Sequence, residues 1–200
     1  MSDTSCFEKL NIKLSENNPL FKDYKTFEYK QIEVGIFHKS RTFRQFRVSA
    51  SYFENEPIGE VIKKFNLVPT IFLIEAGYCY NWHRDAFRFA AYNMMLSDDP
   101  NYVVAFAPEY TADLKVEAMP LYTPITQLIY EPRNFYVLNT QIAHLSINCS
   151  NTDRYILTLA SYIRMYGSDI RSGNRSYYNE VIEELKKLNF IDDTDSNTNI

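Results

Sequence analysis

Two distant stretches of the sequence carry side chains that could hold a catalytic metal. The first places His83 and Asp85 two positions apart, and the second places His144 much later in the chain. Two imidazoles and one carboxylate are the ligand set that holds Fe(II) on one face and leaves the opposite face open for reactants. The sequence therefore predicts a non-haem iron site in which His83, Asp85 and His144 are the catalytic metal ligands.

The spacing of His83 and Asp85 is typical of a β-strand. Residues i and i+2 of a strand point to the same side, so both side chains could reach one metal while Trp82 and Arg84 face away. His144 must then come from a strand that lies near the first one in space. Asp85 could instead pair with a neighbouring arginine. A carboxylate on a strand among apolar strands is costly to bury unless it is paired or metal-bound.

A basic residue follows the second stretch. The run 149–153 is rich in Asx and Ser/Thr side chains that bond their own backbone, which predicts a turn. Arg154 then opens the mostly apolar run 154–162, and we expect a hairpin that brings Arg154 back towards His144. A guanidinium held there could bind a carboxylate through two parallel hydrogen bonds. The alternative is a surface arginine that pairs with Asp153.

These residues together resemble the pattern of the iron- and 2-oxoglutarate-dependent oxygenase superfamily over roughly residues 70–165. The resemblance implies a mainly β fold, the double-stranded β-helix (a cupin-like jelly-roll), with a few flanking helices. It implies Fe(II) bound by His83, Asp85 and His144, and 2-oxoglutarate as cosubstrate with its distal carboxylate anchored by Arg154.

Three further residues belong to the expected cosubstrate site: Arg88, Asn93 and Tyr80. Arg88 and Asn93 resemble the strand that follows His-x-Asp in some small members of the superfamily. Arg88 could also contact a carboxylate of the substrate or orient Asp85. The sequence departs from the superfamily at Ile156, where many members carry Ser or Thr two residues after the arginine. The second contact to 2-oxoglutarate is therefore unassigned.

The length of 200 residues and the hydrophobic fraction of 46% suit one domain with a sizeable core. We expect a single oxygenase domain over residues 1–191 and a disordered polar tail over 192–200. Many short apolar runs separated by turn-forming residues, such as the cluster 97–100, predict a β sandwich or barrel. Helices are expected over 57–65 and, with a cap at Ser176, near the C-terminus.

The net charge of −4 gives no global basic field for a polyanion, which argues against nucleic acid as a partner. The segment 37–47 interleaves basic and aromatic residues. It could form a patch for an anionic substrate or, as we favour, a strand whose aromatic rings pack inward. The three cysteines have no metal-binding spacing and predict reduced thiols. No membrane-spanning run or signal pattern is present, so we expect a cytoplasmic protein.

The resemblance implies a 2-oxoglutarate-dependent dioxygenase that hydroxylates a C–H bond. The favoured substrate is an amino acid that is free or part of a protein, so a small molecule or a peptide is the expected partner. Two alternatives stay open. One is a cupin-type metal enzyme without 2-oxoglutarate, but such sites draw mainly on histidines and this chain has only three. The other is a jelly-roll binding or structural protein in which the His and Asp residues are incidental.

Overall fold

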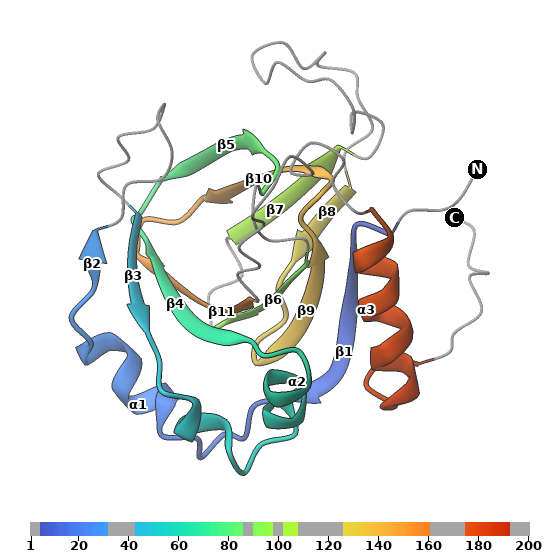
Figure 1. Ribbon diagram of the computed structural model, residues 1–200. Helices are drawn as coiled ribbons and strands as arrows, with labels where there is room; N and C mark the ends of the chain where they lie inside the picture. Colours follow the sequence, from blue (N-terminus) through green and yellow to red (C-terminus); the bar gives the residue numbers. More distant parts are fainter. Residues whose placement is uncertain are drawn as a thin grey trace, which may run out of the picture.

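The computed structural model describes residues 5–31, 43–85, 90–97, 102–107, 126–160 and 175–192. Two antiparallel sheets face each other and enclose a barrel (Figure 1). Within the described residues, the larger sheet has seven strands, in the order β1 (Phe7–Lys13), β9 (Asn134–Asn139), β6 (Ala90–Met95), β11 (Arg154–Ala160), β4 (Val68–Ile74), β3 (Phe43–Arg47) and β2 (Lys30–Gln31). The smaller sheet has four, in the order β5 (Cys79–His83), β10 (Ala143–Asn148), β7 (Tyr102–Ala107) and β8 (Thr126–Ile129).

The path of the chain through these sheets confirms the expected double-stranded β-helix. From β4 to β11 the chain crosses from one sheet to the other at every step except between β7 and β8. The strands of each sheet are therefore neighbours in space although they are distant in sequence. Ile12 and Leu14 alternate with Lys13 in the sequence, which predicts an edge strand. β1 confirms it, because this strand lies at the edge of the larger sheet.

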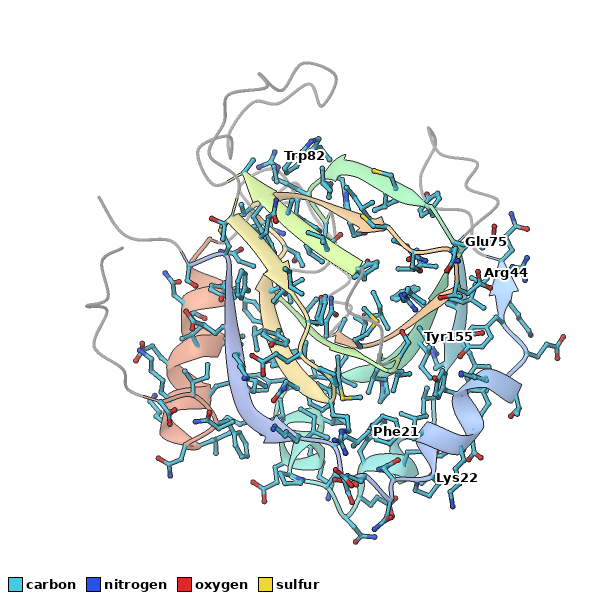
Figure 2. All side chains as sticks on the ribbon, turned by 180° about the vertical axis from the view of Figure 1, so that it is seen from behind. Phe21, Lys22, Arg44, Glu75, Trp82 and Tyr155 are labelled. Atoms are coloured by element: carbon cyan, nitrogen blue, oxygen red, sulfur yellow. The ribbon has the colours of Figure 1, made fainter. Side chains whose placement is uncertain are left out.

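Strand alternation divides the side chains of the larger sheet between two buried compartments. The first, which we call the outer core, lies between this sheet and the helices, and Phe21 and Tyr155 lie on that side (Figure 2). The second, which we call the barrel interior, lies between the two sheets. The outer core includes Leu10, Ile71, Met94, Leu157 and Leu185. The barrel interior includes Ile74, Met95, Phe106, Leu138 and Ile156.

The helices close the outer core. These are α1 (Leu20–Asp23), α2 (Ile58–Lys64) and α3 (Arg175–Lys187), with 3₁₀ turns at Tyr24–Thr26 and Ala50–Phe53. The helix expected over 57–65 is confirmed as α2, whose side chains Ile58, Val61 and Ile62 are buried. The expected cap at Ser176 is wrong, because α3 already includes Arg175 and Ser176 therefore lies inside the helix.

The N-terminal segments differ in part from the sequence-based expectation. The apolar residues of 26–34 predict a strand. Within the described residues this strand is present as β2, whereas Thr26 belongs to the 3₁₀ turn Tyr24–Thr26; residues 32–42 lie outside the described part. In β3 the ring of Phe46 stacks on Phe27 with centroids 4.2 Å apart, as the inward-packing interpretation requires. Arg44 on the same strand pairs with Glu75 at 3.3 Å (Figure 2).

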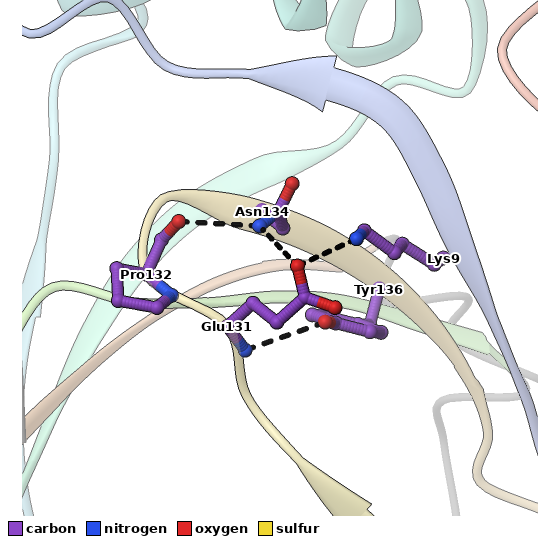
Figure 3. A network of polar contacts seen from close by, with 5 residues as sticks. All are labelled: Lys9, Glu131, Pro132, Asn134 and Tyr136. Carbon is purple, nitrogen blue, oxygen red and sulfur yellow. Dashed lines mark hydrogen bonds and ion pairs between the residues drawn. The ribbon is translucent and has the colours of Figure 1, made fainter. Parts of the chain in front are cut away.

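The turn between β8 and β9 is tied to the edge strand β1 (Figure 3). The Glu131 carboxylate accepts hydrogen bonds from Lys9 Nζ at 2.6 Å and from Asn134 Nδ2 at 3.2 Å. The Glu131 backbone N–H donates to the Tyr136 hydroxyl at 3.3 Å. The residues Pro132, Arg133 and Asn134 predict a turn in the sequence, and the structure confirms it. Its Arg133 adopts the left-handed conformation, with φ 63°.

The expected hairpin of β10 and β11 is wrong. β10 pairs with β5 and β7, whereas β11 pairs with β4 and β6, so residues 149–153 carry the chain from one sheet to the other. Asn148, which is fully buried, holds this corner. Its Nδ2 donates to the carbonyl oxygens of Ile74, Glu75 and Thr152 at 3.1, 3.0 and 2.9 Å. The Asn148 amide thus satisfies carbonyl groups at the end of β4 and in the segment 149–153, and in this way it stabilises the crossing between the two sheets.

Candidate metal centre

The three expected metal ligands lie together at the end of the smaller sheet. Their ligand atoms are all within 4.8 Å of one another. His83 Nε2 and Asp85 Oδ1 are 3.7 Å apart, and the rings of His83 and His144 have centroids 4.3 Å apart. His83 and His144 are direct partners in the pairing of β5 with β10. One ion could therefore contact all three side chains.

A β-bulge in β5 turns His83 into the barrel interior. His144 pairs with His83 and Ser146 pairs with Tyr80, so β5 contributes one more residue than β10 between these two pairs. Directly opposite residues share a face, and His144 itself is opposite Phe106 of the barrel interior. The bulge therefore lets both Tyr80 and His83 face inward, with ring centroids 4.1 Å apart.

The aromatic residue just before His83 takes the other side of the sheet. Trp82 lies on the side of the smaller sheet that faces away from the barrel (Figure 2). Arg84 is exposed. The expectation that Trp82 faces away from the ligands is therefore confirmed, and the same expectation for Arg84 stays a prediction.

The sequence predicted that Asp85 lies on the same strand as His83. In the structure, Asp85 lies just beyond the end of that strand. β5 ends at His83, and the turn before β10 holds the backbone of Asp85 in place. The Asp85 N–H donates to the Thr140 carbonyl at 3.1 Å, and the Asp85 carbonyl accepts from Gln141 Nε2 at 3.1 Å. This turn brings the carboxylate to the two imidazoles without strand alternation, and nothing in the residue types of 140–141 indicated that role.

His144 is oriented by a backbone carbonyl. The side chain is 5% exposed, and its Nδ1 lies 2.9 Å from the carbonyl oxygen of Ile142. A carbonyl oxygen only accepts, so Nδ1 carries the proton and Nε2 presents its lone pair. A metal-binding imidazole is commonly fixed in this way through its other nitrogen. The donor set of the cluster therefore fits a divalent transition metal.

Arg154 opens β11 as expected, and it lies in the barrel interior. It is on the same face of the strand as Ile156, whereas the ring of Tyr155 packs against Tyr24 on the outer side at 5.0 Å. The Arg154 side chain is 2% exposed, and its Nη1 donates to Thr152 Oγ1 at 3.0 Å. A buried guanidinium favours an anionic ligand, because charge-assisted hydrogen bonds are strong where water is excluded.

Of the other residues expected to contact the cosubstrate, Asn93 and Tyr80 are described by the structure and Arg88 is not. Asn93 lies on the inner face of β6, where its Nδ2 donates to the Tyr130 hydroxyl at 3.2 Å. Its Oδ1 is buried and has no hydrogen-bond partner among the described residues. Tyr80 lies beside His83, as given above. Arg88 lies outside the described residues, and so does the expected tail from residue 193 onward. Residues 114–118, for which the sequence predicts a further short strand, lie outside them as well.

The fold is similar to that of several solved enzymes. HygX from Streptomyces hygroscopicus, solved with nickel, 2-oxoglutarate and hygromycin B, matches with a TM-score of 0.56 at 10% identity, over 79% of this chain and 83% of that one. The non-heme alpha-ketoglutarate-dependent epimerase SnoN from nogalamycin biosynthesis gives 0.54 at 10% identity, over 78% and 76%. A Pseudomonas putida prolyl-4-hydroxylase gives 0.51 at 10% identity, over 81% and 95%.

No family model matches the chain, and no curated protein matches it. The structural likeness nevertheless confirms the jelly-roll fold of the 2-oxoglutarate-dependent oxygenases, and the chain brings a His-Asp-His cluster together within that fold. The similar structures include an epimerase as well as a hydroxylase, so the fold itself is compatible with more than one reaction. No helix of the described residues is long and apolar enough to cross a membrane.

Proposed function

We propose that the protein is an Fe(II)- and 2-oxoglutarate-dependent oxygenase that hydroxylates a C–H bond of an amino acid, either free or within a peptide. The observation that carries this proposal is the convergence of His83, Asp85 and His144 within 4.8 Å inside a jelly-roll barrel. The buried Arg154 on the inner face of the opposite sheet supports it, because a dicarboxylate cosubstrate needs a cationic partner.

The roles of the metal ligands follow from their chemistry. His83 and His144 would hold iron through imidazole nitrogens, and Asp85 would hold it through a carboxylate oxygen. The carboxylate offsets part of the metal's charge. Three protein ligands leave the remaining positions of an octahedral ion for reactants. Bound iron together with 2-oxoglutarate supplies the oxidising power that an unactivated C–H bond requires.

The barrel has three further tasks. Arg154 would bind and orient the distal carboxylate of the cosubstrate. We propose that Asn93 and Tyr80, whose side chains face the same interior, contact the cosubstrate as well, and we retain Arg88 as a proposed contact. Apolar side chains such as Phe106 and Ile156, at 0% and 4% exposure, exclude water from the space between the two sheets.

The first test is an anaerobic titration of 2-oxoglutarate into the Fe(II)-loaded protein, recorded in the visible range. We expect a weak metal-to-ligand charge-transfer band that saturates with 2-oxoglutarate and is absent from the His83→Ala variant. Iron binding without the band would favour a cupin-type enzyme that does not use 2-oxoglutarate. Absence of iron binding would contradict the proposal and favour a jelly-roll binding module.

The substrate class requires a separate assay. Succinate release from 2-oxoglutarate should rise when the correct amino acid or peptide is added, and the Asp85→Ala variant should show no such rise. The likeness to a prolyl-4-hydroxylase supports an amino acid or a peptide as the favoured substrate class. Because HygX was solved with hygromycin B bound, another kind of small molecule is the next substrate class to test. The net charge of −4 disfavours nucleic acid. A rise with an oligonucleotide and with no amino acid or peptide would contradict the substrate proposal.

A further inference from the structure

Ile156 leaves the distal carboxylate of 2-oxoglutarate with Arg154 as its one assigned partner. Both side chains lie on the inner face of β11, and the Ile156 side chain, 4% exposed, packs into the barrel interior. An aliphatic side chain cannot donate a hydrogen bond. If the proposed function holds, on which this inference rests, a second donor must come from another strand.

The neighbouring strand β6 brings a hydroxyl to this position. Met95 pairs with Ile156, and the Leu96 N–H donates to the Tyr155 carbonyl at 2.9 Å, so the pairing continues beyond the end of β6. The next two opposite residues are Ser97 and Arg154. Opposite residues of an antiparallel pair share a face, with their Cβ atoms about 5 Å apart. Because Met95 and Ile156 face the barrel interior, Ser97 faces it too, beside Arg154.

The Ser97 Oγ is buried and has no hydrogen-bond partner among the described residues. A buried hydroxyl without a partner is destabilising, so a ligand that accepts its hydrogen bond would gain affinity by satisfying it. The adjacent guanidinium selects an anion, and a carboxylate has one oxygen for each of the two donors.

We propose that Ser97 donates a hydrogen bond to the distal carboxylate of 2-oxoglutarate. The hydroxyl thus reaches the carboxylate from the strand next to Arg154 rather than from the residue two positions after it. The position two after the arginine is then available for Ile156 to pack in the barrel interior. Ser97 is in this way a specificity-determining residue that distinguishes 2-oxoglutarate from 2-oxo acids without a second carboxylate.

The test is the Ser97→Ala variant, titrated anaerobically in its Fe(II) form with 2-oxoglutarate and with 2-oxovalerate, which lacks the distal carboxylate. We expect the Kd for 2-oxoglutarate to rise about tenfold, as for the loss of one hydrogen bond to a charged group, while the Kd for 2-oxovalerate stays unchanged. Ser97→Thr, which retains a hydroxyl, should bind 2-oxoglutarate within about twofold of the wild type.

Tyr92→Phe is the matched control. It removes another buried hydroxyl without a described partner, from the same strand but from the outer core, and it should alter neither affinity. The unfolding temperature of ligand-free Ser97→Ala should be unchanged or raised, because the variant loses an unsatisfied polar group. A purely structural role would lower that temperature and weaken both 2-oxo acids alike.

Each result has a definite meaning. Unchanged 2-oxoglutarate affinity in Ser97→Ala, or an equal loss for both 2-oxo acids, would overturn the assignment of Ser97 and leave the proposed function intact. A wild-type protein that gives no charge-transfer band with 2-oxoglutarate would overturn the proposed function, and the assignment of Ser97 with it.

Discussion

The two buried compartments on either side of the larger sheet contain different kinds of polar group. In the outer core, the buried hydroxyl of Tyr92 has no described hydrogen-bond partner, and burial raises the pKa of the Tyr92 and Tyr178 phenols, so both stay neutral. In the barrel interior, by contrast, the buried groups include His144 and Arg154. An imidazole and a guanidinium can bind a metal and an anion, so this compartment is the one equipped for ligands.

The same strands serve both compartments. On β11, Arg154 and Ile156 face inward, while Tyr155 and Leu157 belong to the outer side. A substitution can therefore change one compartment and leave the other nearly intact. We expect substitutions in the barrel interior to change ligand binding, and substitutions in the outer core to change the free energy of unfolding.

The largest effect is expected at the metal ligands. His144→Ala should weaken Fe(II) binding by at least about 100-fold, because it removes one of three protein ligands. The measurement is an anaerobic Fe(II) titration, with iron content determined after desalting. His83→Ala and Asp85→Ala should behave in the same way. The triad would be refuted by iron affinity that survives all three substitutions.

Arg154→Ala should separate the cosubstrate from the metal. Iron affinity should be retained, while 2-oxoglutarate should bind about 10- to 150-fold more weakly, as for the loss of a charge-assisted contact of about 1.5–3 kcal/mol. The charge-transfer titration measures the change. Binding of 2-oxovalerate serves as the control and should be unaffected. An equal loss for both 2-oxo acids would mean that Arg154 only supports the barrel.

Leu185→Ala is the counterpart in the outer core. Leu185 on α3 is fully buried, so its truncation should lower the free energy of unfolding by about 2–5 kcal/mol. Denaturant titration measures this loss. At a temperature where the variant is still folded, the affinities for Fe(II) and 2-oxoglutarate should equal those of the wild type. A drop in either affinity would show that the two compartments are coupled.

The smallest effect concerns the surface of the outer core. Hydrogen bonds from Lys187 and Lys64 lower the pKa of Glu184 to about 2 and connect α3 with α2. Because the folded-state pKa lies below the unfolded value of about 4.3, the stabilisation is fully present above that value and is lost as the pH falls through about 2. Glu184→Gln should flatten the pH dependence of unfolding in this window, without changing iron binding.

Added salt provides the control for this pair. Because the side chains of Lys64 and Lys187 are 38% and 68% exposed, salt should screen the interaction and reduce the difference between variant and wild type. If denaturation curves recorded between about pH 2 and 4.5 are identical for the two proteins at low salt, the pair has no effect on stability.

Much of the architecture could be predicted because local pattern dominates there. β4, whose side chains are buried or half-buried on both faces, was evident as a continuous apolar run, and α2 was evident from its apolar spacing after Pro57. The ligand set was also predictable, since the chain has only three histidines and two of them occur in the required context. Residue type alone limits the choice at such positions.

The remainder depends on long-range register, which local patterns do not contain. The residues 149–153 indicate a bend, but not whether the next strand joins the same sheet or the opposite one; Asn148 decides this through its bonds to Ile74 and Glu75. Asp85 is positioned by a turn more than fifty residues later in the chain, through Gln141. Ser97 belongs to a polar turn cluster in the sequence, and it becomes a candidate only when its pairing with Arg154 is known.

The bulge in β5 means that the site depends on the number of residues as well as on their identity. Without the bulge, the same sequence would keep all three ligands. Simple alternation would then place Tyr80 and His83, which are three positions apart, on opposite sides of the sheet. Such a chain could still form the barrel, with the imidazole of His83 directed into solvent. A search for similar sites should therefore treat the length of this strand as part of the motif.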